Sequence, residues 1–535
     1  MSESRRMATV AGWMVCLLCA RAVAQDVPPS YPDSFREPMP IYRAGLGALT
    51  RPITTQSAEA QRYFDQGLQL LYAFTPRDAA RSFREAQRRD SSCAMCWLGE
   101  AWAWGPYLNG QMSSEDAPRA YAAMRRASAL AERSASAVER DLIRTMAVRY
   151  APSHQADQRK RLDTAYARAL AALWARYPRD LEVGTLYAES LMLLEPRRGI
   201  WEIQRPEIQR IHRVLEEVLT LDITHPGACH LYVHATESTT RPGKAEACAE
   251  YLGLSIPGAS HINHMPSHTF NRVGRWGESV RANLRAWHSD QRAEIGEGFA
   301  IYPSHNLHML LFAASYDGQG AVAMQAAADY ARLSGEFYRA LTMVRFGRFE
   351  ELLALHDRPT QAIQGGLWDF GRGYAHLREG RRDSARLYLE RVQSGASQAE
   401  GSAAFRGHRA DQLLGIVAGV LEAELARADG KLAEAVAAAE RAVALEDGLT
   451  YDEPEPLPFS PRHWLGALLL EAGHAADAVE VYRDDLERHP RNGWSLFGLE
   501  QSLRAAGRTG DAERARDEFE EAWARADVWL RSSRF

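Results

Sequence analysis

The chain has 535 residues and a formal net charge of -5, with lysine and arginine spread along its whole length. Because it has no polybasic segment, nucleic acid is not an expected partner. No apolar stretch beyond the N-terminus is long enough to span a bilayer, so no membrane span is expected after removal of a leader. The alanine-rich and arginine-rich composition, with few β-branched runs, favours helices.

The first residues are typical of an export signal. Arg5 and Arg6 precede an apolar run, and the small-residue pattern AVA ends at Ala24. We predict cleavage after Ala24, which places the mature chain in the periplasm or outside the cell. Lipidation at Cys19 is a less favoured interpretation, because a leucine precedes this cysteine where a small residue is usual.

After residues 1–24, the chain divides into four predicted regions. Residues 25–55 are proline-rich and predict an extended N-terminal arm. Residues 56–225 contain helical repeats, some of them degenerate, and residues 226–340 form a histidine-rich repeat core. Residues 341–535 contain C-terminal repeats, which an acidic, proline-rich loop at 446–461 interrupts.

The repeats follow the 34-residue tetratricopeptide period. In the unit that begins at Pro226, Ala245, Ala249 and Pro257 fall at the small-residue, packing and terminal-proline positions. The predicted fold is therefore all-α, a tetratricopeptide-repeat solenoid in which antiparallel helix pairs stack and each covers its neighbours' apolar faces. A division into two lobes around 396–407 stays open.

Four cysteines would remain after cleavage, an even number suited to an oxidising compartment. Cys93 and Cys96 favour a local disulfide, with two ordinary thiols as the alternative. Cys229 and Cys248 lie on the two predicted helices of one repeat and could staple it. The spacing alone does not fix the connectivity.

A stripe of histidines crosses three consecutive repeats. Nine of the seventeen histidines lie between His225 and His308, and His230 and His234 recur 34 residues later. A third pair, His305 and His308, matches His261 and His264 if about ten residues, roughly 294–303, are an insertion between repeats. The predicted metal ligands are His230, His234, His261, His264, His268, His305 and His308.

Histidines four residues apart share a helix face, with Cβ atoms about 5–6 Å apart, so each HxxxH pair can chelate one ion. Pro266 fits only a first helical turn, so we expect His264 just outside regular helix. His261 is either a ligand or a donor to one. Imidazole suits copper, zinc or iron, whereas calcium and magnesium need oxygen ligands. Two ions with about three histidines each fit the count better than one iron held by His230, His234 and Glu237.

Four segments resemble those of a group of exported bacterial tetratricopeptide-repeat proteins. They are HPGACHLYVHATE (225–237), HINHMPSHTFNRVGRW (261–276), YPSHNLHML (302–310) and HPRNGWSLFGL (489–499). The resemblance covers most of the mature chain. It implies the fold and export, and it implies no reaction.

These patterns support three hypotheses. The first is an exported metalloenzyme: an oxidoreductase if the metal is copper or iron, or a hydrolase with Glu237 as general base if it is zinc. The second is a metal carrier without catalysis. The third is a scaffold whose concave groove binds a peptide. Tyr232, Arg272, Tyr302 and Asn306 are the candidate contacts of a small-molecule or peptide ligand in that groove.

Overall fold

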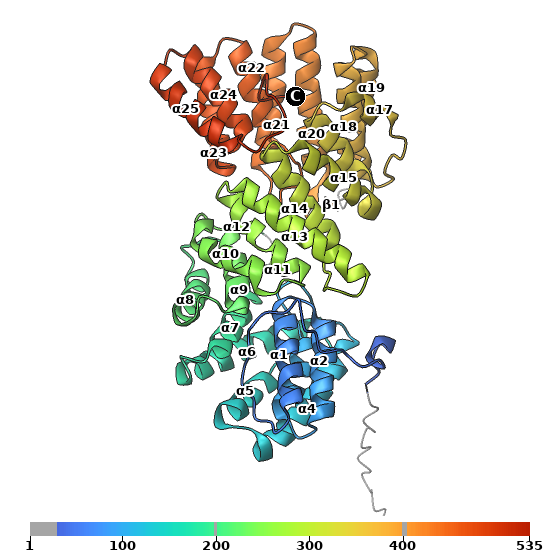
Figure 1. The fold of residues 1–535 in the computed structure, drawn as a ribbon. Helices are drawn as coiled ribbons and strands as arrows, with labels where there is room; N and C mark the ends of the chain where they lie inside the picture. Colours follow the sequence, from blue (N-terminus) through green and yellow to red (C-terminus); the bar gives the residue numbers. More distant parts are fainter. Residues whose placement is uncertain (1–28, 197–198, 200, 399–403) are drawn as a thin grey trace, which may run out of the picture.

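The computed structural model describes residues 29–196, 199, 201–398 and 404–535 (Figure 1). The predicted signal sequence and its cleavage site lie outside these residues. Antiparallel helix pairs stack in chain order from the blue N-terminal end to the red C-terminal end, which confirms the all-α tetratricopeptide-repeat solenoid. In the described part of the chain, no helix is both long and apolar enough to cross a membrane.

The N-terminal arm lies along the first helix. It contains one short 3-10 helix, η1 (Asp33–Phe35), and its backbone N–H groups at Tyr42 and Gly47 donate to the side chains of Gln66 and Gln69 on α1. The helices of this end are α1 (Ala58–Tyr72), α2 (Pro76–Arg89), α3 (Ala94–Ala103), α4 (Asp116–Ser134), α5 (Ala137–Ala147), α6 (Ala156–Arg176), α7 (Leu181–Met192) and α8 (Pro206–Leu221).

The middle of the chain carries the histidine stripe. Its elements are α9 (Pro226–Glu237), η2 (Pro242–Ala245), α10 (Glu246–Ser255), α11 (Ser260–His264), α12 (Pro266–Arg272), α13 (Trp276–Glu294), α14 (Pro303–Tyr316) and α15 (Gly320–Ser334). The proline does mark a break, which falls at Met265 between α11 and α12, but His264 is the last residue of α11 and not outside the helix as expected. The expected insertion is the loop over 295–302, between α13 and α14.

The C-terminal half continues the series of pairs. Its elements are α16 (Phe337–Arg345), α17 (Phe349–Ala354), α18 (Ala362–Arg378), α19 (Arg382–Gln398), the hairpin of β1 (Ala404–Phe405) and β2 (His408–Arg409), α20 (Ala410–Ala428), α21 (Leu432–Asp447), α22 (Arg462–Glu471), α23 (Ala475–Arg488), α24 (Gly493–Ala505) and α25 (Thr509–Ala522). The acidic, proline-rich loop covers 448–461, because α21 extends two residues into the predicted loop.

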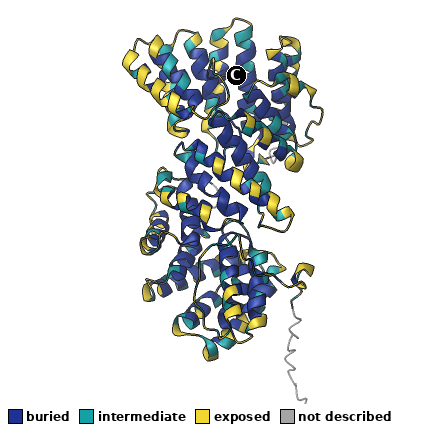
Figure 2. Ribbon diagram, in the orientation of Figure 1, coloured by how far each residue is buried: buried dark blue, intermediate teal, exposed yellow. Residues whose placement is uncertain are grey.

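Two large apolar cores meet at the histidine helices. One contains buried residues from the N-terminal arm to Met265 with Phe299, and the other begins at Trp276 and reaches Trp464. The second core includes residues on both sides of 396–407, so no boundary between lobes lies there. In Figure 2 the helices between the two ends are mostly buried. The histidine stripe is therefore enclosed by protein on both sides.

The structure contains both expected disulfides. Cys93 is bonded to Cys96 at the start of α3, and Cys229 on α9 is bonded to Cys248 on α10. The second bond staples the helix pair that carries the first histidines, a pairing that the cysteine spacing left open.

We predict that Gly498→Ala destabilises the C-terminal repeats. The ring of the buried Tyr482 packs against Gly498, and a Cβ atom there would lie 2.2 Å from its Cζ. Overpacking of this kind typically costs about 1–3 kcal/mol. Thermal unfolding followed by circular dichroism should show a lower midpoint. Gly510→Ala, at an exposed and open position of α25, is the matched control and should leave the midpoint unchanged or raise it. Equal midpoints for the two variants would contradict this packing account.

Candidate metal centre

Six of the seven predicted histidine ligands converge between α9, α11, α12 and α14. The described residues form three groups whose potential ligand atoms lie within 4.8 Å of one another. These groups are His230, His234 and His261; His264, His268 and His305; and His234, Glu237, His268 and Glu453. The first two groups are called here the first triad and the second triad. The third group shares one histidine with each triad.

The first triad is held against the turn between α1 and α2. His230 donates from Nδ1 to the carbonyl oxygen of Tyr72 at 2.7 Å, and its Nε2 lies 3.1 Å from His261 Nε2. The Phe74 ring covers the triad, with its centroid 4.2 Å from that of His230 and 5.2 Å from that of His261. The first repeat, far away in sequence, therefore forms one wall of the site.

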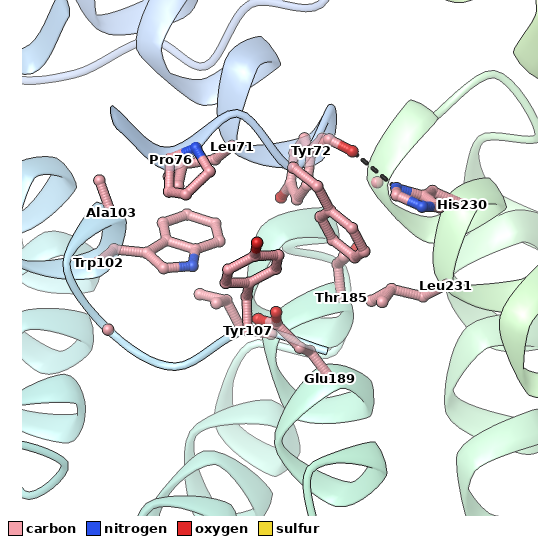
Figure 3. Close-up of a pocket in the computed structure, with 14 residues that line it drawn as sticks. Leu71, Tyr72, Pro76, Trp102, Ala103, Tyr107, Thr185, Glu189, His230 and Leu231 are labelled. Atoms are coloured by element: carbon pink, nitrogen blue, oxygen red, sulfur yellow. Dashed lines mark hydrogen bonds between the residues drawn. The ribbon is translucent and has the colours of Figure 1, made fainter. Parts of the chain in front are cut away.

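A small cavity of about 20 Å³ lies behind His230 (Figure 3). The rings of Tyr72, Trp102 and Tyr107 line it, together with the carboxyl group of Glu189, and burial raises the pKa of that group to about 6. Its volume suffices for about one water molecule. This side of the triad is therefore a packed wall and not a ligand cavity.

The second triad has a well-defined hydrogen-bond direction. Asn283 donates from Nδ2 to the carbonyl oxygen of Ser279 at 2.9 Å, so its Oδ1 accepts from His264 Nδ1 at 2.8 Å. His264 Nε2 is then an acceptor and lies 2.6 Å from His268 Nε2. The His305 ring, with its centroid 4.6 Å from that of His264, completes the triad.

Glu237 connects the two triads. One carboxylate oxygen accepts from His234 Nδ1 at 2.7 Å, and the other accepts from His268 Nδ1 in a short hydrogen bond. The hydroxyl of Tyr451 donates to the same carboxylate at 3.1 Å. Glu237 itself is only 1% exposed. A single carboxylate therefore orients one imidazole of each triad.

The loop over 448–461 brings a second carboxylate to the site. Glu453 Oε2 lies 3.1 Å from His268 Nδ1. The loop is anchored at the C-terminal end of α23, where His489, the residue after the helix, donates from Nε2 to Glu455 at 2.9 Å and from Nδ1 to Asp485 at 2.9 Å. The C-terminal repeats thus hold Glu453 and Tyr451 over the histidines.

The charges around the second triad separate the pKa values of neighbouring histidines. Burial lowers the pKa of His268, but the charge and hydrogen bond of Glu237, together with Glu453, outweigh it and raise that pKa to about 9. Burial and the charge of His268 lower the pKa of His264 to about 3. Burial and neighbouring histidines also lower the pKa values of His261 and His305 well below the usual range. A proton on His268 Nε2 can be donated to His264 Nε2, which explains their 2.6 Å separation.

The structure departs from the predicted ligand set at His308. This side chain is buried, but it belongs to none of the three groups, and its ring stacks on Tyr338 with centroids 4.1 Å apart. It lies one helical turn beyond His305, where α16 covers α14.

The four predicted ligand contacts divide into two kinds. Tyr302 lies beside the first triad, 5.6 Å from His261 between ring centroids, and Arg272 donates from Nε to the carbonyl oxygen of Glu237. The other two face neighbouring helices: the hydroxyl of Tyr232 donates to Glu216 at 2.6 Å, and Asn306 Nδ2 donates to Asp290 at 2.8 Å. Each residue on a helix turns about 100° from the one before it, so residues next to a ligand point elsewhere.

Sequence patterns missed several residues of the site. Glu453 and Tyr451 come from an acidic loop whose fold over the histidines no local pattern indicates. Phe74 follows α1 in the first repeat and carries no motif, and Asn283 lies on α13, at a packing position of the repeat that carries His264. The one signal for these loop residues was composition: an acidic loop in a chain with many clustered histidines could fold over them.

No protein-family model and no curated protein match the chain. Solved structures similar to it include the APC/C hetero-tetramer Cut9-Hcn1 (13% identity over 86% of this chain and 76% of that chain, TM-score 0.30). The human IFIT1 dimer with m7Gppp-AAAA shows 10% identity over 87% of this chain and 90% of that chain, with a TM-score of 0.31. The P58(IPK) TPR domain shows 11% identity over 84% and 99%, with a TM-score of 0.20. Likeness at these levels supports no inference about ligand or reaction.

We predict that His489 stabilises the metal-free protein in a pH-dependent way. Burial alone would lower the pKa of His489, but Glu455 and Asp485 raise it to about 10, above the value of about 6.5 expected in the unfolded chain. The stabilisation is therefore fully present below about pH 6.5 and is lost as the pH rises through about 10. The melting-temperature gap between wild type and His489→Gln should shrink from about pH 6 to about pH 10.

The control for this prediction is His474→Gln, since His474 is exposed on the protein surface. It should leave the melting temperature nearly unchanged at every pH. A gap for His489→Gln that stays constant with pH would contradict the ion-pair arrangement.

Proposed function

We propose that this chain is an exported metalloprotein with a binuclear transition-metal centre, one ion in each histidine triad. One observation carries the proposal: four imidazoles point Nδ1 at an oxygen acceptor. These are His230 to the Tyr72 carbonyl, His264 to Asn283, and His234 and His268 to Glu237. Histidines that bind metals through Nε2 almost always donate Nδ1–H to such an acceptor.

The packing of Nε2 atoms supports the same proposal. Pairs at 2.6 Å and 3.1 Å place imidazole nitrogens close together inside the protein. His230, His264 and His268 are oriented through Nδ1–H, so the two Nε2 atoms of each pair need a proton or a metal ion between them. A transition metal satisfies several nitrogens at once.

Three imidazoles for each ion favour copper or zinc. Imidazole suits both metals, and a site with three protein ligands leaves a coordination position open for a substrate. Bound copper would supply redox chemistry with oxygen, and bound zinc would supply Lewis acidity. The open position favours an enzyme over a metal carrier.

Within this proposal, Glu237 acts by positioning histidines. Its two oxygens accept from two Nδ1–H groups, and Tyr451 donates to it as well. A carboxylate with these bonds orients ligands and raises their basicity. The role of general base, which the sequence suggested for a zinc hydrolase, would require Glu237 to give up one of these contacts.

Two further features bear on the setting of the centre. The leader pattern and the two disulfides support export to an oxidising compartment.

A mononuclear centre is the alternative to two metal ions, because His234, Glu237, His268 and Glu453 form a group of two histidines and two carboxylates suited to iron or zinc. A peptide-binding scaffold is the second candidate function, and the solenoid fold favours it.

We expect protein purified from the periplasm without an affinity tag to contain up to two copper or zinc ions per chain. His230→Ala and His264→Ala each remove a ligand of a different triad, so each should lower the content by about one ion, and together they should abolish binding. Elemental analysis, divided by the protein concentration, gives the number of metal ions per chain.

His288→Ala is the matched control, because His288 lies outside the three groups and is exposed. It should retain the full metal content. A wild-type protein that stays free of metal after incubation with each ion would leave the peptide scaffold as the remaining function. One ion per chain retained in both single variants and in the double variant would favour the mononuclear centre, because neither His230 nor His264 belongs to that group.

Glu237→Gln should weaken metal binding about 10–100-fold, since the amide oxygen can accept from one Nδ1–H group while the amide NH2 cannot accept from the other. Competition with a chelator of known affinity measures the change. The structurally similar change Glu217→Gln, on α8 and outside the groups, is the control. Unchanged affinity combined with lost turnover would instead identify Glu237 as a general base.

A further inference from the structure

Two adjoining cavities lead from the second triad to the loop over 448–461. The smaller, of about 40 Å³, has His268 in its wall. The larger, of about 260 Å³, lies beside the same loop. Arg272, Tyr451 and Arg488 line both. The larger cavity has more than six times the volume of the smaller one, which suits a small organic molecule.

Arg272 is the cation at the wall that the two cavities share. Its Nε donates to the Glu237 carbonyl oxygen at 3.1 Å, and its guanidinium lies 5.8 Å from the Tyr451 ring centroid. Among the described residues, none accepts a hydrogen bond from its two terminal NH2 groups and none forms an ion pair with it. Arg488 differs, because its NH2 lies 2.8 Å from Asp447. Arg272 is thus fixed in place with donors that remain available.

The carboxylates along the cavities have other cationic partners, apart from exposed Glu487 at the rim. The pairs are Glu446 with Arg462, Asp452 with Arg406, Glu455 with His489, and Glu453 with His268. Burial raises the pKa of Glu455, but His489, with a smaller contribution from Arg272, lowers it overall. One guanidinium is available to neutralise a ligand, and the surrounding carboxylates would repel any further negative charge. The cavities therefore favour a ligand with a single negative charge and disfavour binding of a dianion.

The larger cavity also has an apolar wall, opposite in character to the hydroxyl side chains of Ser238, Thr239, Thr240 and Thr450 that line it elsewhere. Leu449, Pro456, Leu457 and Phe459 form this part of its lining. A ligand that fits would have a carboxylate at one end and an apolar body at the other. Arg272 and His268 lie four residues apart on α12, so a carboxylate on Arg272 places the ligand about one helical turn from the second triad.

We propose that these cavities bind a small organic monocarboxylate, with the carboxylate on Arg272 and the apolar body against the wall around Leu457. This inference rests on the proposed function, since it makes that acid the substrate class of the metal centre. A planar guanidinium can hold a carboxylate through two parallel hydrogen bonds.

The test uses 3-phenylpropionate and its neutral analogue 3-phenylpropan-1-ol as probes, titrated calorimetrically into the mature protein with and without zinc. The acid should bind more tightly than the alcohol. Arg272→Met should weaken acid binding on the order of 10–100-fold, the loss expected for charge-assisted hydrogen bonds, and leave alcohol binding nearly unchanged. Arg272→Lys, which keeps the charge but not the planar fork, should give an intermediate affinity.

Arg488→Met is the matched control, because it removes an arginine that lines the same cavities and already has a partner. It should change acid binding by less than about threefold, as expected for a partly exposed ion pair. Absent acid binding, equal affinities for acid and alcohol, or equal losses in the two methionine variants would overturn the inference.

Zinc content, measured on the same samples, separates this inference from the proposed function. It should be equal in wild type and Arg272→Met. Zinc bound without any acid binding would contradict the monocarboxylate site alone. If the wild-type chain binds the acid but takes up no metal, the proposed metal centre is contradicted. The cavities would then be a monocarboxylate-binding site without metal chemistry.

Discussion

The direction of four imidazole rings is the constraint on which the site depends. Each ring gives its Nδ1–H to an oxygen that is held in place: the Tyr72 carbonyl at the end of α1, the Asn283 amide on α13, and, for two rings, the Glu237 carboxylate at the end of α9. A buried histidine without such a partner could rotate or take the other tautomer. With these partners, the Nε2 atoms are directed inward, and their proximity is tolerable only with a proton or a metal between them.

The solenoid makes this arrangement possible because stacked repeats place equivalent helix positions side by side. The histidines of α9 and of α11 with α12 are one repeat apart, and α14 adds His305. The C-terminal repeats close the site from the other end, since His489 anchors the loop that carries Glu453 and Tyr451. Stability of the C-terminal units and geometry of the metal centre are therefore coupled through one loop.

The sequence indicated the fold and most of the histidine cluster, because both follow a local period. The 34-residue spacing placed His230 and His264 together, and Pro266 located the helix break correctly. Residues fixed by distant contacts could not be found in this way. His308 keeps the spacing but faces Tyr338, and Glu453 reaches the site through a loop whose path depends on side chains at the end of α23. Periodicity predicts which helix face a residue occupies, and not which neighbour covers that face.

The most direct test of the binuclear centre is a crystal structure of the metal-loaded protein with anomalous diffraction recorded at the copper and zinc edges. The account predicts two anomalous peaks, one in each triad, each about 2.0–2.1 Å from imidazole nitrogens. One peak bound by His234, Glu237, His268 and Glu453, or no peak among these residues, would contradict it.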